Sequence, residues 1–135
     1  MPIPTELFTT IMGRFTSDNA PDPAAVAAEV WRTLFRRFTP LIGPLSTNLV
    51  FLRSLSRHET DFPWLPQIEP SAPHTTFDAF ERSLQGRPAE EIFAVNRALL
   101  AAYAGIVAEL IGVPLTTKFM EAAFADDDTN KKIEE

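Results

Sequence analysis

The chain has 135 residues, of which 45% are hydrophobic and 22% charged, a composition typical of a single soluble globular domain. It contains no cysteine, which excludes disulfides, iron–sulfur clusters and thiol catalysis, and its two histidines make most metal sites hard to build. A net charge of -6 argues against general affinity for nucleic acid, because nucleic-acid-binding domains are usually basic. With neither a signal peptide nor a long uninterrupted apolar run, we expect a cytoplasmic protein that does not bind membranes.

Alanine and leucine dominate the sequence and glycine is scarce, which favours an all-α fold. The first helix is predicted over residues 4–15, where apolar residues recur every four positions at Leu7, Ile11 and Phe15. The second begins at Pro23, because Asp22 is a good N-cap and proline suits the first helical position. Pro40 is expected to end or kink it.

A third helix is predicted from a cap at Ser46 or Thr47 to about Thr60. Residues 61–76 show no helical period, and their repeated prolines favour an extended strap. The prolines are Pro63, Pro66, Pro70 and Pro73. We expect three apolar residues to fix this strap over the helices, namely Trp64, Leu65 and Ile68.

Thr75 is predicted to cap a short fourth helix that ends at Gly86. Pro88 then starts the longest helix, which is expected to run to about Ile111. A last amphipathic helix should lead into residues 126–135, whose charged composition predicts an acidic disordered tail.

The chain also contains an internal similarity. Residues 41–47, Leu-Ile-Gly-Pro-Leu-Ser-Thr, resemble residues 110–117, Leu-Ile-Gly-Val-Pro-Leu-Thr-Thr, with one residue inserted. We interpret residues 23–60 and 88–125 as two related helical hairpins; common turn chemistry between helices is the alternative. The fold prediction is therefore a single all-α domain, residues 1–125, of five or six helices, in which the hairpins form a four-helix-bundle-like core with a proline-rich strap.

One short motif suggests phosphoryl chemistry. The run His58-Glu59-Thr60-Asp61-Phe62-Pro63 resembles the phosphoacceptor box of sensor histidine kinases, which implies an exposed helical histidine that receives a phosphoryl group beside an acid. The family has a small polar residue before the proline, where this chain has Phe62, and no ATP-binding domain is recognisable here. The resemblance therefore implies a phosphorelay-type protein and excludes an autokinase. The alternative is that His58 lies at the edge of the core with its ring nitrogens satisfied locally. His74 is predicted to be a loop residue in the strap.

Four arginines form two pairs at helical spacing. Arg32 and Arg36 lie in the second helix, and Arg53 and Arg57 in the third. Because a short turn would make these helices antiparallel, we predict that the four share one surface and bind a protein partner that is acidic at the contact. A solvated face with no binding role is the alternative.

Two polar residues fall beside the apolar seam of the longest helix. Asn96 is flanked by apolar residues, and Tyr103 lies about two turns further on. Such residues usually fix the register of packed helices or bond to a carbonyl. The alternative is a ligand pocket between the hairpins, lined by these two residues and His58.

No catalytic set can be assembled, because the chain has neither a Gly-x-Ser-x-Gly motif nor a glycine-rich phosphate loop. We therefore incline away from an enzyme and expect no catalytic residues, no metal and no cofactor. The sequence favours a non-catalytic interaction or regulatory module that binds a protein partner. The alternatives are a small-molecule sensor and, as a minor one, a phosphorelay protein using His58. Eleven phenylalanines and two tryptophans are a heavy aromatic load, which favours a homodimer.

Overall fold

The computed structural model describes residues 3–15, 22–66 and 76–134, with side-chain surroundings described up to residue 124. All the regular secondary structure in this part of the chain is α-helix, which confirms the all-α prediction. The helices are α1 (Thr5–Arg14), α2 (Pro23–Ile42), α3 (Pro44–Arg57), α4 (Thr76–Leu84), α5 (Ala89–Ile111) and α6 (Val113–Glu134).

The boundaries of α2 and α3 show which local signals decide the fold. Asp22 caps α2 as predicted, accepting a hydrogen bond from the backbone nitrogen of Ala24 at 3.1 Å. Pro40 does not end α2, which continues to Ile42. Proline lacks an N–H, but only two helical residues follow it, and the Gly43 nitrogen still donates to the Thr39 carbonyl at 2.8 Å, which closes the last turn. The helix α3 begins at Pro44, two residues before the predicted cap, since proline suits the first helical position.

In each hairpin a single glycine forms the sharp corner between the two helices, and the two corners have matching geometry. Gly43, between α2 and α3, has φ 89° and ψ 156°, and Gly112, between α5 and α6, has φ 91° and ψ 153°. Each glycine nitrogen donates to the carbonyl four residues back at 2.8 Å, and each glycine carbonyl accepts from a threonine nitrogen four residues on at 3.1 Å. These threonines are Thr47 and Thr116. Since the spacing from glycine to threonine is four residues in both corners, the two segments align without the inserted residue that was predicted from the sequence.

The helices that follow the corners also bury equivalent positions. Counted from the corner glycine, both α3 and α6 bury their fourth, eighth, eleventh and twelfth residues. In α3 these are Thr47, Phe51, Ser54 and Leu55, and in α6 they are Thr116, Met120, Ala123 and Phe124. The two hairpins are therefore related in backbone geometry and in burial pattern.

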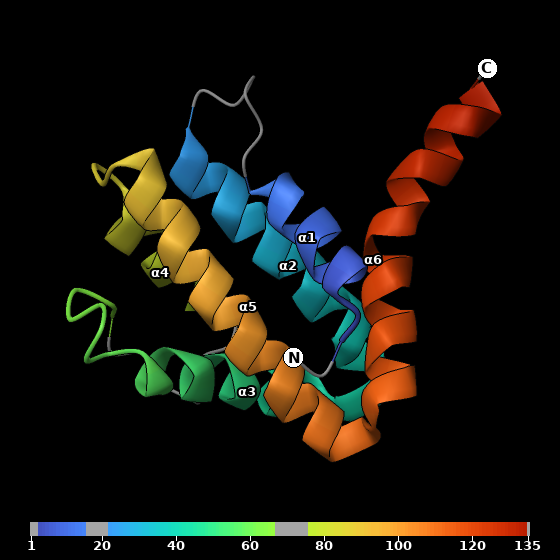
Figure 1. Cartoon of the computed structure of the whole chain (residues 1–135), viewed down its shortest axis with the longest axis horizontal. Coiled ribbons are helices and arrows are strands. Elements are labelled where there is room, and N and C mark those ends of the chain that lie inside the picture. The colour runs from blue at the N-terminus through green and yellow to red at the C-terminus, as the bar shows by residue number, and fades with distance from the viewer. Residues whose placement is uncertain (1–2, 16–21, 67–75, 135) are drawn as a thin grey trace.

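The packing of the hairpins has the same symmetry. Helix α2 packs against α3, α5 and α6, and α5 packs against α6, α2 and α3, so exchanging the hairpins leaves these contacts unchanged. Figure 1 shows α2 and α5 side by side, with α3 crossing below them and α6 at the right. The remaining helices cover this core, α4 against α2, and α1 against α2, α5 and α6. The prediction of a four-helix-bundle-like core is confirmed.

The indole of Trp31 lies at the centre of this core. Its ring centroid is 4.9 Å from that of Phe51, 5.4 Å from that of Tyr103 and 6.3 Å from that of Phe15. These neighbours come from α3, from α5 and from the residue that ends α1. One fully buried side chain therefore joins the two hairpins to the N-terminal helix.

The first part of the strap is anchored by two of its apolar residues. Leu65 is buried, and the Arg87 guanidinium lies 3.8 Å from the centroid of the Trp64 ring, a cation–π contact. Trp64 and Leu65 thus hold the described part of the strap as predicted. This part forms turns and is not extended, since the Leu65 nitrogen donates to the Phe62 carbonyl at 3.0 Å. The predictions for Ile68, Pro70, Pro73, His74 and Thr75 lie outside the described residues.

The C-terminal segment differs from its predicted form. Residues 126–134, expected to be a disordered acidic tail, continue α6 as helical backbone. Acidic residues placed four positions before lysines favour a helix, and the sequence has this spacing at 127 and 131 and at 128 and 132. The domain boundary near residue 125 stays a prediction.

The helix α5 is long and apolar enough to cross a membrane by length and composition. The sequence reading missed this property. In the structure half of that stretch is buried, and the helix packs among α2, α3 and α6, as the core helix of a bundle does.

The corner glycines generate a test of the fold. Their φ and ψ values lie in a region that is almost closed to other residues. Gly43→Ala and Gly112→Ala should each lower the free energy of unfolding, measured in urea, by about 1–3 kcal/mol. Gly13→Ala is the control, because Gly13 is exposed in α1, and this change should raise stability by roughly 0.5–1 kcal/mol. Corner variants as stable as the control would contradict the geometry.

Candidate functional site

The predicted arginine surface is divided among separate places. Arg32 joins α2 to α4, with Nη2 2.8 Å from Asp78 Oδ1 and Nη1 3.6 Å from Glu81 Oε1. Its Nη1 also lies 4.0 Å from Glu29 Oε2 on its own helix. Arg32 is therefore engaged by carboxylates of the same chain, which the sequence could not show because the α2–α4 contact is tertiary.

The other three arginines differ from Arg32 in their surroundings. Arg36 lies 3.2 Å from Glu29 Oε1 and also donates to the Thr33 hydroxyl. Arg53 and Arg57 are exposed on α3, and neither has an ion pair within the described part of the chain. No described contact brings the α2 pair and the α3 pair together.

Asn96 and Tyr103 lie inside the core. Asn96 Oδ1 accepts a hydrogen bond from Trp31 Nε1 at 2.8 Å, and Asn96 Nδ2 donates to the Ile92 carbonyl at 2.8 Å. The Tyr103 hydroxyl is 3.1 Å from Thr47 Oγ1, and burial raises the pKa of this phenol to about 12. These contacts link α5 to both helices of the first hairpin, so the two residues fix packing and register. Neither residue lines either of the two pockets described below.

His58 follows the last residue of α3 as its C-cap. The backbone nitrogen of His58 donates to the Leu55 carbonyl at 3.1 Å, and its ring Nδ1 lies 3.4 Å from Asp61 Oδ2. The histidine therefore stands at a helix end beside a local acid, whereas the kinase resemblance implied a position on an exposed helical face. It lines neither of the two pockets.

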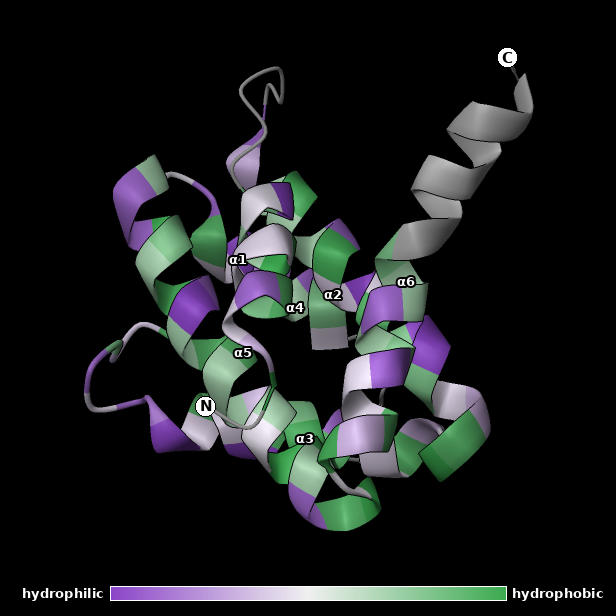
Figure 2. Ribbon diagram, turned by 45° about the vertical axis from the view of Figure 1, so that its right-hand side comes forward, coloured by the Kyte–Doolittle hydropathy of each residue, from purple (hydrophilic) through white to green (hydrophobic). Residues whose placement is uncertain are grey.

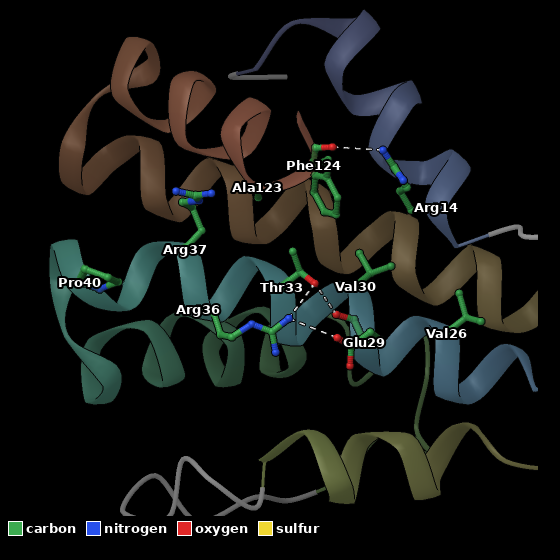
Figure 3. Close-up of a pocket in the computed structure, with 10 residues that line it drawn as sticks. All are labelled: Arg14, Val26, Glu29, Val30, Thr33, Arg36, Arg37, Pro40, Ala123 and Phe124. Atoms are coloured by element: carbon green, nitrogen blue, oxygen red, sulfur yellow. Dashed lines mark hydrogen bonds and ion pairs between the residues drawn. The ribbon is translucent and has the colours of Figure 1, made fainter. Parts of the chain in front are cut away.

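A pocket of about 710 Å³ lies between α1, α2 and α6 (Figure 3). Arg14 donates to the Phe124 carbonyl at 3.3 Å and covers the Phe124 ring, while Arg37 donates to the Ala122 carbonyl at 3.2 Å. Figure 3 shows the guanidinium of Arg36 beside the carboxylate of Glu29. The full lining is Arg14, Val26, Glu29, Val30, Thr33, Arg36, Arg37, Pro40, Ala123 and Phe124. We call this the arginine pocket.

A second hollow, of about 550 Å³, runs between α3 and α5. Its lining is mostly apolar, with Arg53 as the charged member. The lining residues are Ser46, Leu49, Val50, Leu52, Arg53, Ser56, Ile106 and Leu110. We call this hollow the corner groove, because Leu110 lies just before the Gly112 corner and Ser46 just after the Gly43 corner.

The corner groove belongs to a larger apolar surface at one end of the molecule. All the large hydrophobic side chains exposed in the described residues lie within a few residues of the two corners: Leu41, Leu45, Leu49, Leu110 and Val113. Figure 2 shows hydrophobic ribbon at this lower end, around the start of α3 and the end of α5, as it does along the core helices. We call these five residues the apolar end. The sequence reading missed them, although Leu45 and Leu49 repeat at helical spacing away from the buried stripe of α3.

Among the described residues, no group of three or more histidine, cysteine or acidic side chains could hold a metal ion. Their buried side-chain polar atoms are also all hydrogen-bonded, so no orphaned group points to a missing ligand. Comparisons with protein-family models, with curated proteins and with solved structures found no match to this chain.

Tyr103 provides a test of the polar core, because it is the only tyrosine in the sequence. Its absorbance should titrate near pH 12 in the folded protein, because burial stabilises the neutral phenol, and near the ordinary value of about 10 in urea. Since the folded pKa is the higher one, this group's contribution to stability is complete below pH 10 and falls as the pH rises to 12. Titration near 10 in the folded state would contradict the burial of Tyr103.

Proposed function

We propose that this chain is a non-catalytic helical interaction module that binds a protein through its corner groove. The observation that carries the proposal is the gathering of the exposed large hydrophobic side chains of the described residues at one end of the molecule. Single exposed leucines are ordinary, but several exposed apolar side chains gathered at one end beside a groove are typical of a protein contact. A helix that presents apolar residues every three or four positions would fit such a groove.

The charge beside the groove supports the same function. Arg53 lines the groove, and Arg57 stands one turn further along α3. Because Arg32 and Arg36 are already engaged by carboxylates, the α3 pair carries what remains of the predicted arginine surface. A partner that is acidic at the contact would pair with Arg53 while its apolar residues cover Leu49 and Leu110.

Photo-crosslinking at the groove tests this proposal in the cells that make the protein. A photoreactive amino acid at Leu110 should give a discrete protein adduct, because this side chain is 60% exposed at the groove. The same group at Glu90, exposed at the opposite end of α5, should give none. Equal adducts from both positions, or none from Leu110, would contradict the proposal.

A small-molecule sensor is the second candidate, and the arginine pocket favours it. This pocket lies between α2 of the first hairpin and α6 of the second, with Val26, Val30 and Phe124 beside arginine side chains. Its size is within the range of ligand sites, and guanidinium groups beside apolar walls suit an organic anion with an apolar body.

A thermal-shift measurement tests the second candidate. Sodium octanoate should raise the melting temperature of the wild type by several degrees, because a ligand of the native state stabilises it, while inorganic phosphate should have less effect. Arg36→Gln should abolish the rise, because Arg36 lines the pocket. Arg53→Gln, in the other hollow, is the matched control and should keep it. No rise in the wild type, or an equal rise in Arg36→Gln, would reject the sensor.

A further inference from the structure

We infer that the occupant of the corner groove is a second copy of this chain, packed about a twofold axis that pairs Arg53 of each copy with Glu109 of the other. The inference rests on the proposed function, because it names the partner of the groove already described. Two observations support it: the opposite charges of Arg53 and Glu109 at the groove, and the exposed apolar residues that line it.

The groove has a cation in its lining and an anion beside it in the sequence of α5. Arg53 is exposed on the α3 side. Glu109 is exposed on α5, one turn after Ile106 and next to Leu110, both of which line the groove. Neither Arg53 nor Glu109 has an ion pair with another described residue. The surface therefore presents one cation and one anion, both available to a partner.

A twofold axis matches these charges without any other molecule. In such an interface the same surface of both copies takes part, so α3 of one copy faces α5 of the other and each Arg53 meets a Glu109. A partner that is only acidic would satisfy Arg53 but would bring a like charge towards Glu109. A second copy satisfies both groups, and its Glu109 supplies the acidic contact expected of a partner.

The apolar residues complete the surface. Leu49 and Leu110 are 51% and 60% exposed in the single chain, and both line the groove together with Arg53. Stable interfaces are larger than one groove, commonly about 600–1,000 Å² on each partner. The apolar end supplies that extension, because α2 and α5 run side by side to the same end of the molecule, where Leu41, Leu45 and Val113 lie near the two corners (Figure 1). With a net charge of -6 on each copy, non-specific association is opposed, so the local pairs select this contact.

Charge reversal in sedimentation equilibrium tests the inference. Arg53→Glu and Glu109→Arg should each weaken dimerisation by about tenfold or more, since each variant alone places like charges in contact. An equal mixture of the two variants should recover the dimer, because in the mixed dimer the introduced glutamate faces the introduced arginine and the second pair is the native one. The double variant should recover it as well. Arg97→Glu is the control, because Arg97 is exposed on α5 and lines a different hollow from the groove.

The variants should fold normally, because exposed charges contribute little to stability, and unchanged circular dichroism and melting temperature will verify this. A wild type that stays monomeric at millimolar concentration would overturn the inference. A dimer that neither single reversal weakens, or a mixture that does not recover it, would do the same. The Leu110 crosslink separates this failure from that of the proposed function. If the wild type is monomeric but Leu110 crosslinks to a different protein, the second copy is excluded and the proposed function stands. If the wild type is monomeric and Leu110 gives no adduct, both proposals are wrong.

Discussion

Two glycine corners determine where the other parts of this molecule lie. Gly43 and Gly112 share φ values near 90° and ψ values near 155°, a conformation that residues with a side chain adopt only under strain. Because the corners match, α3 and α6 leave the long helices in the same way and bury equivalent positions. Because α2 and α5 pack side by side and run in the same direction, both corners lie at one end of the molecule (Figure 1). The leucines beside each corner lie outside the buried stripes there, which leaves them exposed and creates the apolar end.

The interior contains polar groups, but these groups serve packing. Trp31 donates to Asn96 and Tyr103 contacts Thr47, so α5 is tied to both helices of the first hairpin. A buried polar atom without a partner is costly, and in the described residues each such side-chain atom has one. No buried side-chain atom of the described residues is therefore left for a ligand, and the candidate sites are the corner groove and the arginine pocket at the surface.

Caps, prolines and glycines in the sequence predicted most of the helices. The contacts between distant helices could not be predicted from them. The cap at Asp22 and the glycine at residue 112 set the start of α2 and the end of α5 as expected. Pro40 was expected to end or kink α2, but the helix continues to Ile42, because only two helical residues follow the proline. The spacing of Arg32 and Arg36 suggested a free cationic face, but α4 brings Asp78 and Glu81 to Arg32 from a distant part of the chain. The apolar end could not be predicted, because the sequence does not show which leucines stay outside the core. The helical spacing of Leu45 and Leu49 was the one local signal for it.

We propose that the apolar end is a contact surface between protein chains. Leucine methyl NMR measures this surface directly, by comparing spectra of the wild type at low and high concentration. We expect concentration-dependent shifts for the methyl groups of Leu45, Leu49 and Leu110, which are exposed. The methyl groups of Leu34 and Leu99, which are buried in the core, should not shift. Unchanged spectra for Leu49 and Leu110 at millimolar concentration, or shifts spread equally over buried and exposed leucines, would contradict it.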